Sequence, residues 1–557
     1  MRYSKFLFLF LISSLLFSGN SALAAKNAKN KKPVVMVQVE PIIEAANLFS
    51  ADGDFKTSAA KLTRDLASVE MCKESGSARV DVTVSAVEAE IQKSQPNFLI
   101  LRDEVIGNSE KKIAGIKSKE QLDAFIKKYE GPAGSEQRKN YESLDSASQM
   151  LVLQLRALIP MKSFFFRAKS FVARNSITRT TIVTMLRAQA VGVQNFTQVG
   201  WGSTNPQTVS NNSGLWEAAY NYMTEPFPDM ASKIDGDGDL ELFMGSLLNS
   251  AIRINNDYKV IVEDAIKNQS SFWWDNKLYL SIANFSDPKD RYIKLGIAEL
   301  LAIRSALSLG VSTLAATTSY SFKGFQASIG QVGVLMGFTP SNVRDVTVGA
   351  NGAEGMTSKN RFNVLKSHKD LFTRKDDYKK RMETAYTNLR DSVYQAKSSY
   401  DCVAKRSAGD QYLFDVRMAQ SMNRIALNSF GNLVNLFEKK EVGSTVIAGE
   451  KINVDLWGFY NNPPASLSDL YPVEFNDRSN GTVPEVSVKA WGEKDSLRNY
   501  KYESARSWKL AEYNKLFPGI KPDESGQKTT EVGRYARILS QSWGSAVFAI
   551  PLSAFVF

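Results

Sequence analysis

The feature that most restricts the fold of this chain is a long stretch almost without charge. Ser305–Val343 contains 39 residues, and Lys323 is the only charged one. Up to about Thr317, apolar residues recur at helical spacing, which predicts a helix that begins near Asp290. Eight Ser and Thr hydroxyls keep its hydropathy low, and they disfavour spontaneous insertion into a bilayer. We therefore expect the helix to be the buried centre of a soluble protein.

Beyond Thr317 the pattern changes from helical to alternating. Tyr320 and Phe322 alternate with serines, and after Lys323-Gly324 the alternation continues to Phe338. This predicts a hairpin over residues 318–338, with one apolar face and one hydroxyl-bearing face. Such hairpins occur in half-buried soluble sheets, and they also line membrane pores. Both interpretations stay open at this point.

The segment before this stretch is basic. Ser146–Trp216 contains no Asp or Glu. With the cluster Phe164–Phe166, it could form an amphipathic surface that binds anionic lipid. Alternatively, its basic residues pair with acidic residues elsewhere in the fold. The candidates for anionic-surface binding are Arg156, Lys162, Arg167, Lys169, Arg174 and Arg179.

The N-terminus has the three parts of a secretory signal peptide. Arg2 and Lys5 precede the apolar run Phe6–Phe17, and Ala22-Leu23-Ala24 supplies a small-x-small cleavage site. We expect residues 1–24 to be removed, leaving no transmembrane helix. The protein is then periplasmic or associated with the outer envelope, or else secreted. In such an oxidising compartment, Cys72 and Cys402 either form a disulfide or remain two buried thiols.

Few catalytic or metal sites fit this composition. His368 is the only histidine, so zinc sites built on several histidines are excluded, and GxSxG, HExxH and P-loop motifs are absent from the sequence. Asp235, Asp237, Asp239 and Glu241 resemble the start of a calcium loop. Leu240 replaces the turn glycine of an EF-hand, however, so the acids could instead cap a helix over Leu240–Ile252. Calcium is the only cofactor that the sequence suggests.

The rest of the chain suggests a division into four regions after the signal peptide. Residues 25–145 are expected to be mixed α/β, with strands at Ala78–Ala86 and Phe98–Leu101. Residues 146–345 are mainly helical, with an aromatic cluster at 272–275 that we expect to be buried. Residues 346–440 contain an antiparallel helical hairpin over about 374–440, whose first arm has a heptad seam from Met382 to Val403. Residues 441–557 combine short strands at 446–452 and 454–459 with a helix at 504–517.

These patterns predict a predominantly helical α+β protein. The net charge of +11 fits an anionic partner. We expect an exported, envelope-associated binding or scaffold protein without catalytic activity. Its partners would be proteins, anionic lipids or glycans, and no nucleic acid is expected. One alternative is a glycan hydrolase that uses two carboxylates; another is a membrane-active protein that uses the 318–338 hairpin.

Overall fold

The structure of the protein is a computed structural model. It describes residues 72, 83–168, 214–228, 233–278, 291–328, 367–406, 412–414, 434, 436–437, 443–447, 450–467, 474–475, 506–507, 514–515 and 517–518. The predicted signal peptide lies outside these residues, and so do Lys169, Arg174 and Arg179.

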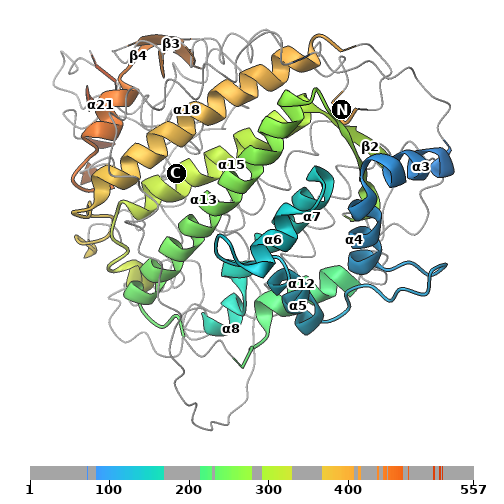
Figure 1. Cartoon of the computed structure of the whole chain (residues 1–557). Coiled ribbons are helices and arrows are strands. Elements are labelled where there is room, and N and C mark those ends of the chain that lie inside the picture. The colour runs from blue at the N-terminus through green and yellow to red at the C-terminus, as the bar shows by residue number, and fades with distance from the viewer. Residues whose placement is uncertain are drawn as a thin grey trace, which may run out of the picture.

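The described part of the chain is mostly helical with small antiparallel sheets, as the sequence predicted. Its longest helices, α13 (Asp237–Lys267), α15 (Ile297–Thr318) and α18 (Tyr378–Val403), run side by side through the molecule (Figure 1). On one side lie α3 (Val84–Ser94), α4 (Pro96–Ile106), α5 (Lys119–Lys127), α6 (Glu136–Glu142), α7 (Ser146–Arg156) and α12 (Gly214–Thr224). On the other side lie β3 (Gly443–Ile447), β4 (Glu450–Val454) and α21 (Leu456–Asn461).

Helices α15 and α18 are antiparallel and are joined by serine hydroxyls. Their contacts recur at every seventh residue, forward along α15 and backward along α18, which is the repeat of a heptad seam. The hydroxyls donate to carbonyls of the opposite helix: Ser399 to Ala298 at 2.7 Å, Ser305 to Ser392 at 2.8 Å and Ser312 to Ala385 at 2.7 Å. Two of the hydroxyls that lower the hydropathy of α15, those of Ser305 and Ser312, therefore hold it against its neighbour.

Helix α15 lies in the centre of the fold. It is the one helix among the described residues that is long and apolar enough to cross a membrane, and most of that apolar window is buried inside the protein. This agrees with the expectation of a buried helix. Its start is later than predicted, because residues 292–295 form a strand and the helix begins at Ile297.

The described residues form two apolar cores. The N-side core combines α3–α7, α12 and the sheet of β1 (Phe272–Asp275) and β2 (Tyr292–Leu295) with one end of each long helix. The C-side core combines the other ends of the long helices with α21. Buried polar residues lie on the long helices between the two cores. We call Asn255, Arg304, Ser308, Asp391 and Gln395 the middle polar layer.

The sheets are small and antiparallel. Strand β1 pairs with β2 from Phe272 opposite Leu295 to Asp275 opposite Tyr292. Strand β3 pairs with β4, and β5 (Glu474–Phe475) pairs with β6 (Arg506–Ser507). The strand predicted at 454–459 is wrong, because Asp455 caps helix α21 through the Gly458 N–H. Strand β6 likewise lies inside the helix predicted at 504–517.

The predicted N-terminal strands are also wrong where the structure describes them. Thr83 accepts a hydrogen bond from the Ala86 N–H and caps α3, so Val84 begins a helix. Phe98–Leu101 belong to α4, where Phe98, Leu99 and Leu101 are buried. An apolar run this short does not distinguish a strand from a buried helix, and the burial of both faces explains the error.

The predicted 318–338 hairpin is not formed in its described part. Residues 325–328 form a helical turn, and Tyr320 makes an isolated antiparallel bridge to Arg374. Tyr320 and Phe322 are both buried in the C-side core, as expected of the apolar face, but Ser319 of the predicted hydroxyl face is buried as well. Residues 329–338 lie outside the described residues.

The first arm of the predicted helical hairpin is helix α18. Met382, Tyr386, Leu389, Val393 and Val403 of its seam are buried, whereas Ala396 and Tyr400 are partly exposed. Most of the returning arm lies outside the described residues. Within it, Val434, Leu436 and Phe437 are buried in the C-side core.

Candidate functional site

The first two basic candidates for surface binding are internal. Arg156 is buried and forms ion pairs with Glu130 and with Asp257, the latter at 2.7 Å. Lys162 is buried, pairs with Asp123 at 2.9 Å, and lies 4.3 Å from the centre of the Phe227 ring. The alternative interpretation, pairing with acids elsewhere in the fold, therefore holds for these two residues, and the surface-binding prediction is wrong for them.

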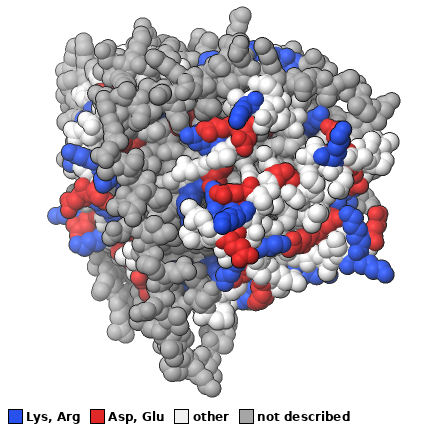
Figure 2. Space-filling view, viewed as in Figure 1, with Lys and Arg blue, Asp and Glu red and all other residues white. Residues whose placement is uncertain are grey.

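Arg167 is partly buried. Its burial lowers the pKa of the guanidinium, and the negative charge of nearby Asp239 opposes this shift. Phe164 of the same turn stacks on Phe243, with ring centres 4.5 Å apart, whereas Phe166 is exposed. On the described surface seen in Figure 2, Lys and Arg lie beside Asp and Glu. The described part of the face shown in Figure 2 therefore carries no strongly basic patch.

The proposed calcium ligands bind protein groups instead. Asp237 accepts hydrogen bonds from the N–H groups of Gly324, at 2.7 Å, and Gln326, at 2.8 Å. Glu241 accepts from the Phe322 N–H at 2.6 Å and pairs with Lys375 at 2.9 Å. The two acids thus hold the segment after α15 against the start of α13.

The remaining carboxylates of the motif do not complete a site. Asp239 accepts a hydrogen bond from the Asp235 backbone N–H at 3.1 Å. Among the described residues, no group of three or more His, Cys, Asp or Glu side chains is arranged to hold a metal ion. Calcium stays a prediction that these contacts do not favour.

The two cysteines are joined in a disulfide, with their Cα atoms 5.0 Å apart. The bridge connects Cys72, before α3, to Cys402 in the last turn of α18, across 330 positions of sequence. Trp273 and Trp274 are buried in the N-side core, as expected for the aromatic cluster. His368 is partly buried, and this burial lowers its pKa.

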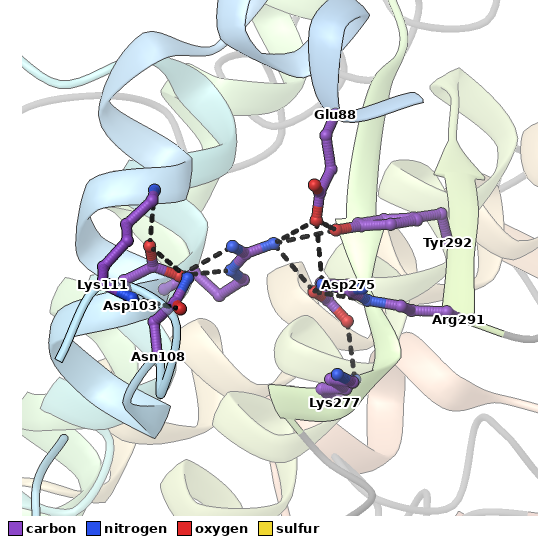
Figure 3. A network of polar contacts seen from close by, with 9 residues as sticks. Glu88, Asp103, Asn108, Lys111, Asp275, Lys277, Arg291 and Tyr292 are labelled. Carbon is purple, nitrogen blue, oxygen red and sulfur yellow. Dashed lines mark hydrogen bonds and ion pairs between the residues drawn. The ribbon is translucent and has the colours of Figure 1, made fainter. Parts of the chain in front are cut away.

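The most extensive ionic network that can be followed in the described residues lies where α3, α4 and the β1–β2 sheet meet (Figure 3). At its centre is Arg102 of α4, which is 5% exposed. Its guanidinium donates to Asp103 at 2.7 Å, to Asp275 at 3.1 Å and to the Tyr292 hydroxyl at 2.8 Å. We call these residues, with Glu88 and Arg291, the Arg102 network.

Two carboxylates of this network share the same cations. Glu88 and Asp275 both contact Arg291 Nη2, at 3.0 and 3.2 Å, and both contact Arg102 Nη1. The Tyr292 hydroxyl donates to Glu88 at 2.6 Å. The other oxygen of Asp275 accepts from the Lys277 N–H at 2.9 Å.

The surroundings favour the ionised form of Glu88 and of Asp103. Burial works to raise the pKa of Glu88, but the Tyr292 hydrogen bond, Arg291 and Arg102 outweigh it and lower that pKa. Burial is likewise outweighed at Asp103, whose pKa is lowered by Lys111 and Arg102. A general acid of a glycan hydrolase requires the opposite shift. This geometry therefore suits fixing helices to a sheet better than proton transfer.

A second buried ion pair, between Glu299 and Arg406, is also surrounded by hydrogen-bond donors. Glu299 of α15 is fully buried and receives both Nη groups of Arg406, at 2.6 and 2.7 Å. It also accepts from the N–H groups of Gly296 and Phe414. A bidentate pair with its other lone pairs satisfied is a strong, directional contact. It anchors the chain beyond α18 to the start of α15.

Sequence reasoning did not find either cluster, because their members are dispersed from residue 88 to residue 414 and form no motif. A weak signal was present. Arg102-Asp103 interrupts the apolar run of α4, and Glu299 interrupts that of α15. A charge inside an apolar run must be paired when the run is buried.

Comparison with known proteins gives no match: no family model, no curated protein and no solved structure is similar to this chain.

Proposed function

We propose that the chain is an exported protein of the cell envelope that binds or scaffolds envelope components and catalyses no reaction. The observation that carries this proposal is the state of its described acidic clusters. Asp103, Asp275, Glu299 and Glu241 are each engaged by Arg or Lys side chains and by backbone or amide N–H groups. Such groups stabilise a fold, and they have little capacity left to act on a substrate.

Neither alternative gains support from the Arg102 network or from the described part of the predicted hairpin. A hydrolase needs one carboxyl group with a raised pKa beside an ionised one. In the Arg102 network the resolved carboxyl pKa shifts, at Glu88 and Asp103, are both downward. A membrane-active hairpin would need Tyr320 and Phe322 to be available, and both are buried against α18 and its neighbours in the C-side core.

We place the contact with an anionic partner on the rest of the acid-free segment. Arg156 and Lys162 are used internally and Arg167 is partly buried, so Lys169, Arg174 and Arg179 are the candidates. Leu413 and Phe414 lie in a bend, so the returning helix expected over residues 413–440 does not begin at Leu413. We further propose that the chain returns along α18 as a second helix in the part of this range after Phe414. In support, Phe437 packs on Tyr386 of α18, with ring centres 5.5 Å apart.

The test is co-sedimentation with vesicles of anionic lipid and crosslinking in the native envelope. One variant replaces Lys169, Arg174 and Arg179 by Gln, and its matched control replaces the exposed Lys93, Lys379 and Lys380, which removes the same charge. The proposal expects salt-sensitive binding that the first variant loses and the control keeps. Equal losses in both variants would mean that net charge alone drives binding, and no envelope partner in either assay would contradict the proposal.

A further inference from the structure

The loop between α4 and α5, residues 107–118, is an exposed segment with a fixed shape. Figure 1 shows it extending beyond the helices at the edge of the molecule. Asn108 and Ile113 exchange two backbone hydrogen bonds of 2.9 Å and close a tight turn between them. The Ile116 N–H then donates to the Val105 carbonyl at 3.0 Å, which brings the chain back to α4. The α4–α5 loop is therefore a short hairpin that projects from the end of α4.

Side chains and glycines fix the shape of this hairpin. Asn108 accepts a hydrogen bond from the Lys111 N–H at 3.1 Å and donates to Asp103 at 3.0 Å, and the Lys111 ammonium pairs with Asp103 at 2.9 Å. Gly107 and Gly115 have φ angles of 82° and 70°, and a Cβ atom on Gly115 would lie 2.6 Å from the Gly107 nitrogen. The Arg102 network thus anchors the loop through Asp103. A loop that is already ordered loses little conformational entropy when it binds a partner.

The hairpin displays an apolar side chain among lysines. Ile113 is 39% exposed, although it follows directly after the turn. Lys111, Lys112 and Lys117 are exposed as well, and Glu110 is the one acidic residue of the α4–α5 loop. The loop is only moderately basic. It combines a positive charge with an apolar side chain that projects outward.

A second exposed isoleucine lies beside the base of the hairpin. Ile100 of α4 is 64% exposed. It precedes Gly107 by two helical turns, about 10 Å along the helix axis, and so lies on the same side of α4. The chain near Ile113 packs on Gly107, because a Cβ atom there would lie 3.1 Å from the Ile113 carbonyl oxygen. Glu104, which lies between the two positions, pairs with Lys128 at 3.4 Å and adds no unpaired negative charge.

We propose that the α4–α5 loop is a contact site for the surface of an anionic phospholipid bilayer. Ile113 enters the headgroup layer, and Lys112 and Lys117 lie against the lipid phosphates. Ile100 adds apolar contact at the base of the loop. An apolar side chain gains free energy on leaving water at such an interface, and each nearby lysine adds an electrostatic attraction. An acidic protein would also attract the lysines, but an isoleucine on a projecting loop suits a broad, flat surface better than a groove.

This inference rests on the proposed function, because contact with lipid requires that the chain be exported to the envelope. The α4–α5 loop is nevertheless separate in sequence from Lys169, Arg174 and Arg179, which carry the contact proposed above. Substitutions in the loop and in the acid-free segment can therefore be compared in one assay, and either contact can fail without the other.

The test is co-sedimentation of the full chain with vesicles that contain phosphatidylglycerol and phosphatidylcholine, compared with phosphatidylcholine alone. One variant is Ile113→Asn, which keeps the backbone hydrogen bonds of the hairpin. It should weaken binding about fivefold or more, because the apolar side chain is lost. The other variant combines Lys112→Gln and Lys117→Gln. It should weaken binding about tenfold or more at low salt and much less at high salt.

Matched controls carry the same changes elsewhere on the surface. Val260→Asn replaces an aliphatic side chain of α13 that is 49% exposed, and the pair Lys379→Gln and Lys380→Gln removes two exposed lysines of α18. Both controls should bind the anionic vesicles like the wild type. Circular dichroism of every variant should match the wild-type spectrum.

Four results would overturn the inference. If the wild type binds and both loop variants bind equally well, the lipid contact lies elsewhere and the proposed function stands. Equal weakening in the controls would mean that overall charge or apolarity drives binding. A wild type that binds no anionic vesicle would contradict this inference and the lipid contact proposed above together. Binding of soluble polyglutamate but not of vesicles, with the same dependence on the loop, would make it a site for an acidic protein.

Discussion

The Arg102 network and the middle polar layer are both buried, charged and built on helices, but they differ in how far their groups are satisfied. Arg102 donates to Asp103, Asp275 and Tyr292, and each carboxylate around it has further donors. Arg304 has unpartnered nitrogens and Asp391 an unpartnered oxygen among the described residues. The same residue types therefore have different roles. A satisfied network fixes a fold, whereas an unsatisfied one carries the desolvation cost of its unpaired groups.

The two clusters should also differ in how a substitution changes the stability of the fold. Removing one partner of a satisfied buried pair leaves the others uncompensated and is strongly destabilising. Removing a charge that is already unpartnered relieves a burial cost. The two clusters should therefore respond to equivalent substitutions in opposite ways. Three experiments test this, and a fourth, on the disulfide, tests the covalent link of the N-side core.

The largest effect is expected at Arg102. Arg102→Leu leaves Asp275 and Asp103 buried next to an apolar side chain, so the free energy of unfolding should fall by about 3–5 kcal/mol. Denaturant titration followed by circular dichroism measures it. A loss below about 1 kcal/mol would mean that the network is not what secures α4 to the β1–β2 sheet.

The next effect is expected at the disulfide, which ends in the N-side core beside the same elements. The double variant Cys72→Ala and Cys402→Ala should lose about 2–4 kcal/mol, because the unfolded chain is no longer closed into a loop. Unfolding of the wild-type protein with and without reductant gives the same comparison without substitution. If reduction leaves the stability unchanged, the N-side core does not depend on this covalent link.

The pH dependence should differ in sign between the clusters. Burial raises the pKa of Asp391 to about 6, against the opposing charges of Arg304, Arg390 and Lys259. The folded state therefore binds more protons than the unfolded state between about pH 4 and 6, and stability from this group falls as the pH rises through that window. The effect is at most about 3 kcal/mol.

Glu88 and Asp103 have lowered pKa values, so their contribution is instead lost as the pH falls below their unfolded values. Unfolding curves between pH 3 and 8 (roughly the range that spans both groups) for wild type and Asp391→Asn separate the two. The variant should be relatively more stable above pH 6. A constant difference across the range would show that Asp391 does not titrate with a raised pKa.

The smallest change in stability is expected at Arg304. Arg304→Leu should change the free energy of unfolding by no more than about 1 kcal/mol, or should increase it, since the substitution removes unpartnered donors. Chemical denaturation beside Arg102→Leu gives the direct contrast. A loss comparable to that of Arg102→Leu would mean that Arg304 has a structural partner, and the comparison would then fail.

Much of the helical framework could be read from the sequence. The heptad spacing of Met382, Tyr386, Leu389 and Val393 predicted α18, and the uncharged stretch predicted a buried helix that ends near Thr317. Long periodic segments are predictable because burial of one face repeats every turn. Short apolar runs could not be assigned in this way. Phe98–Leu101 is helical and Phe272–Asp275 is a strand, because a run of a few residues fits both the helical and the strand period.

The candidate sites were much less predictable. Arg156 and Lys162 belong to an acid-free segment, so their partners Glu130, Asp257 and Asp123 had to come from outside it. Nothing local specifies such pairs. The acids at Asp237 and Glu241 fitted the beginning of a calcium loop, but they bind the backbone of residues 322–326, some 80 positions away.

The sequence by itself determined which segments are helical and apolar, because periodicity and charge are properties of neighbouring residues. It also placed Arg304 inside an apolar helix. Only the tertiary structure decided whether such a buried charge has hydrogen-bond partners. These partners come from another helix or strand and must lie within hydrogen-bond distance. Arg102 meets three partners at that distance and Arg304 does not, although both interrupt an apolar run in the same way.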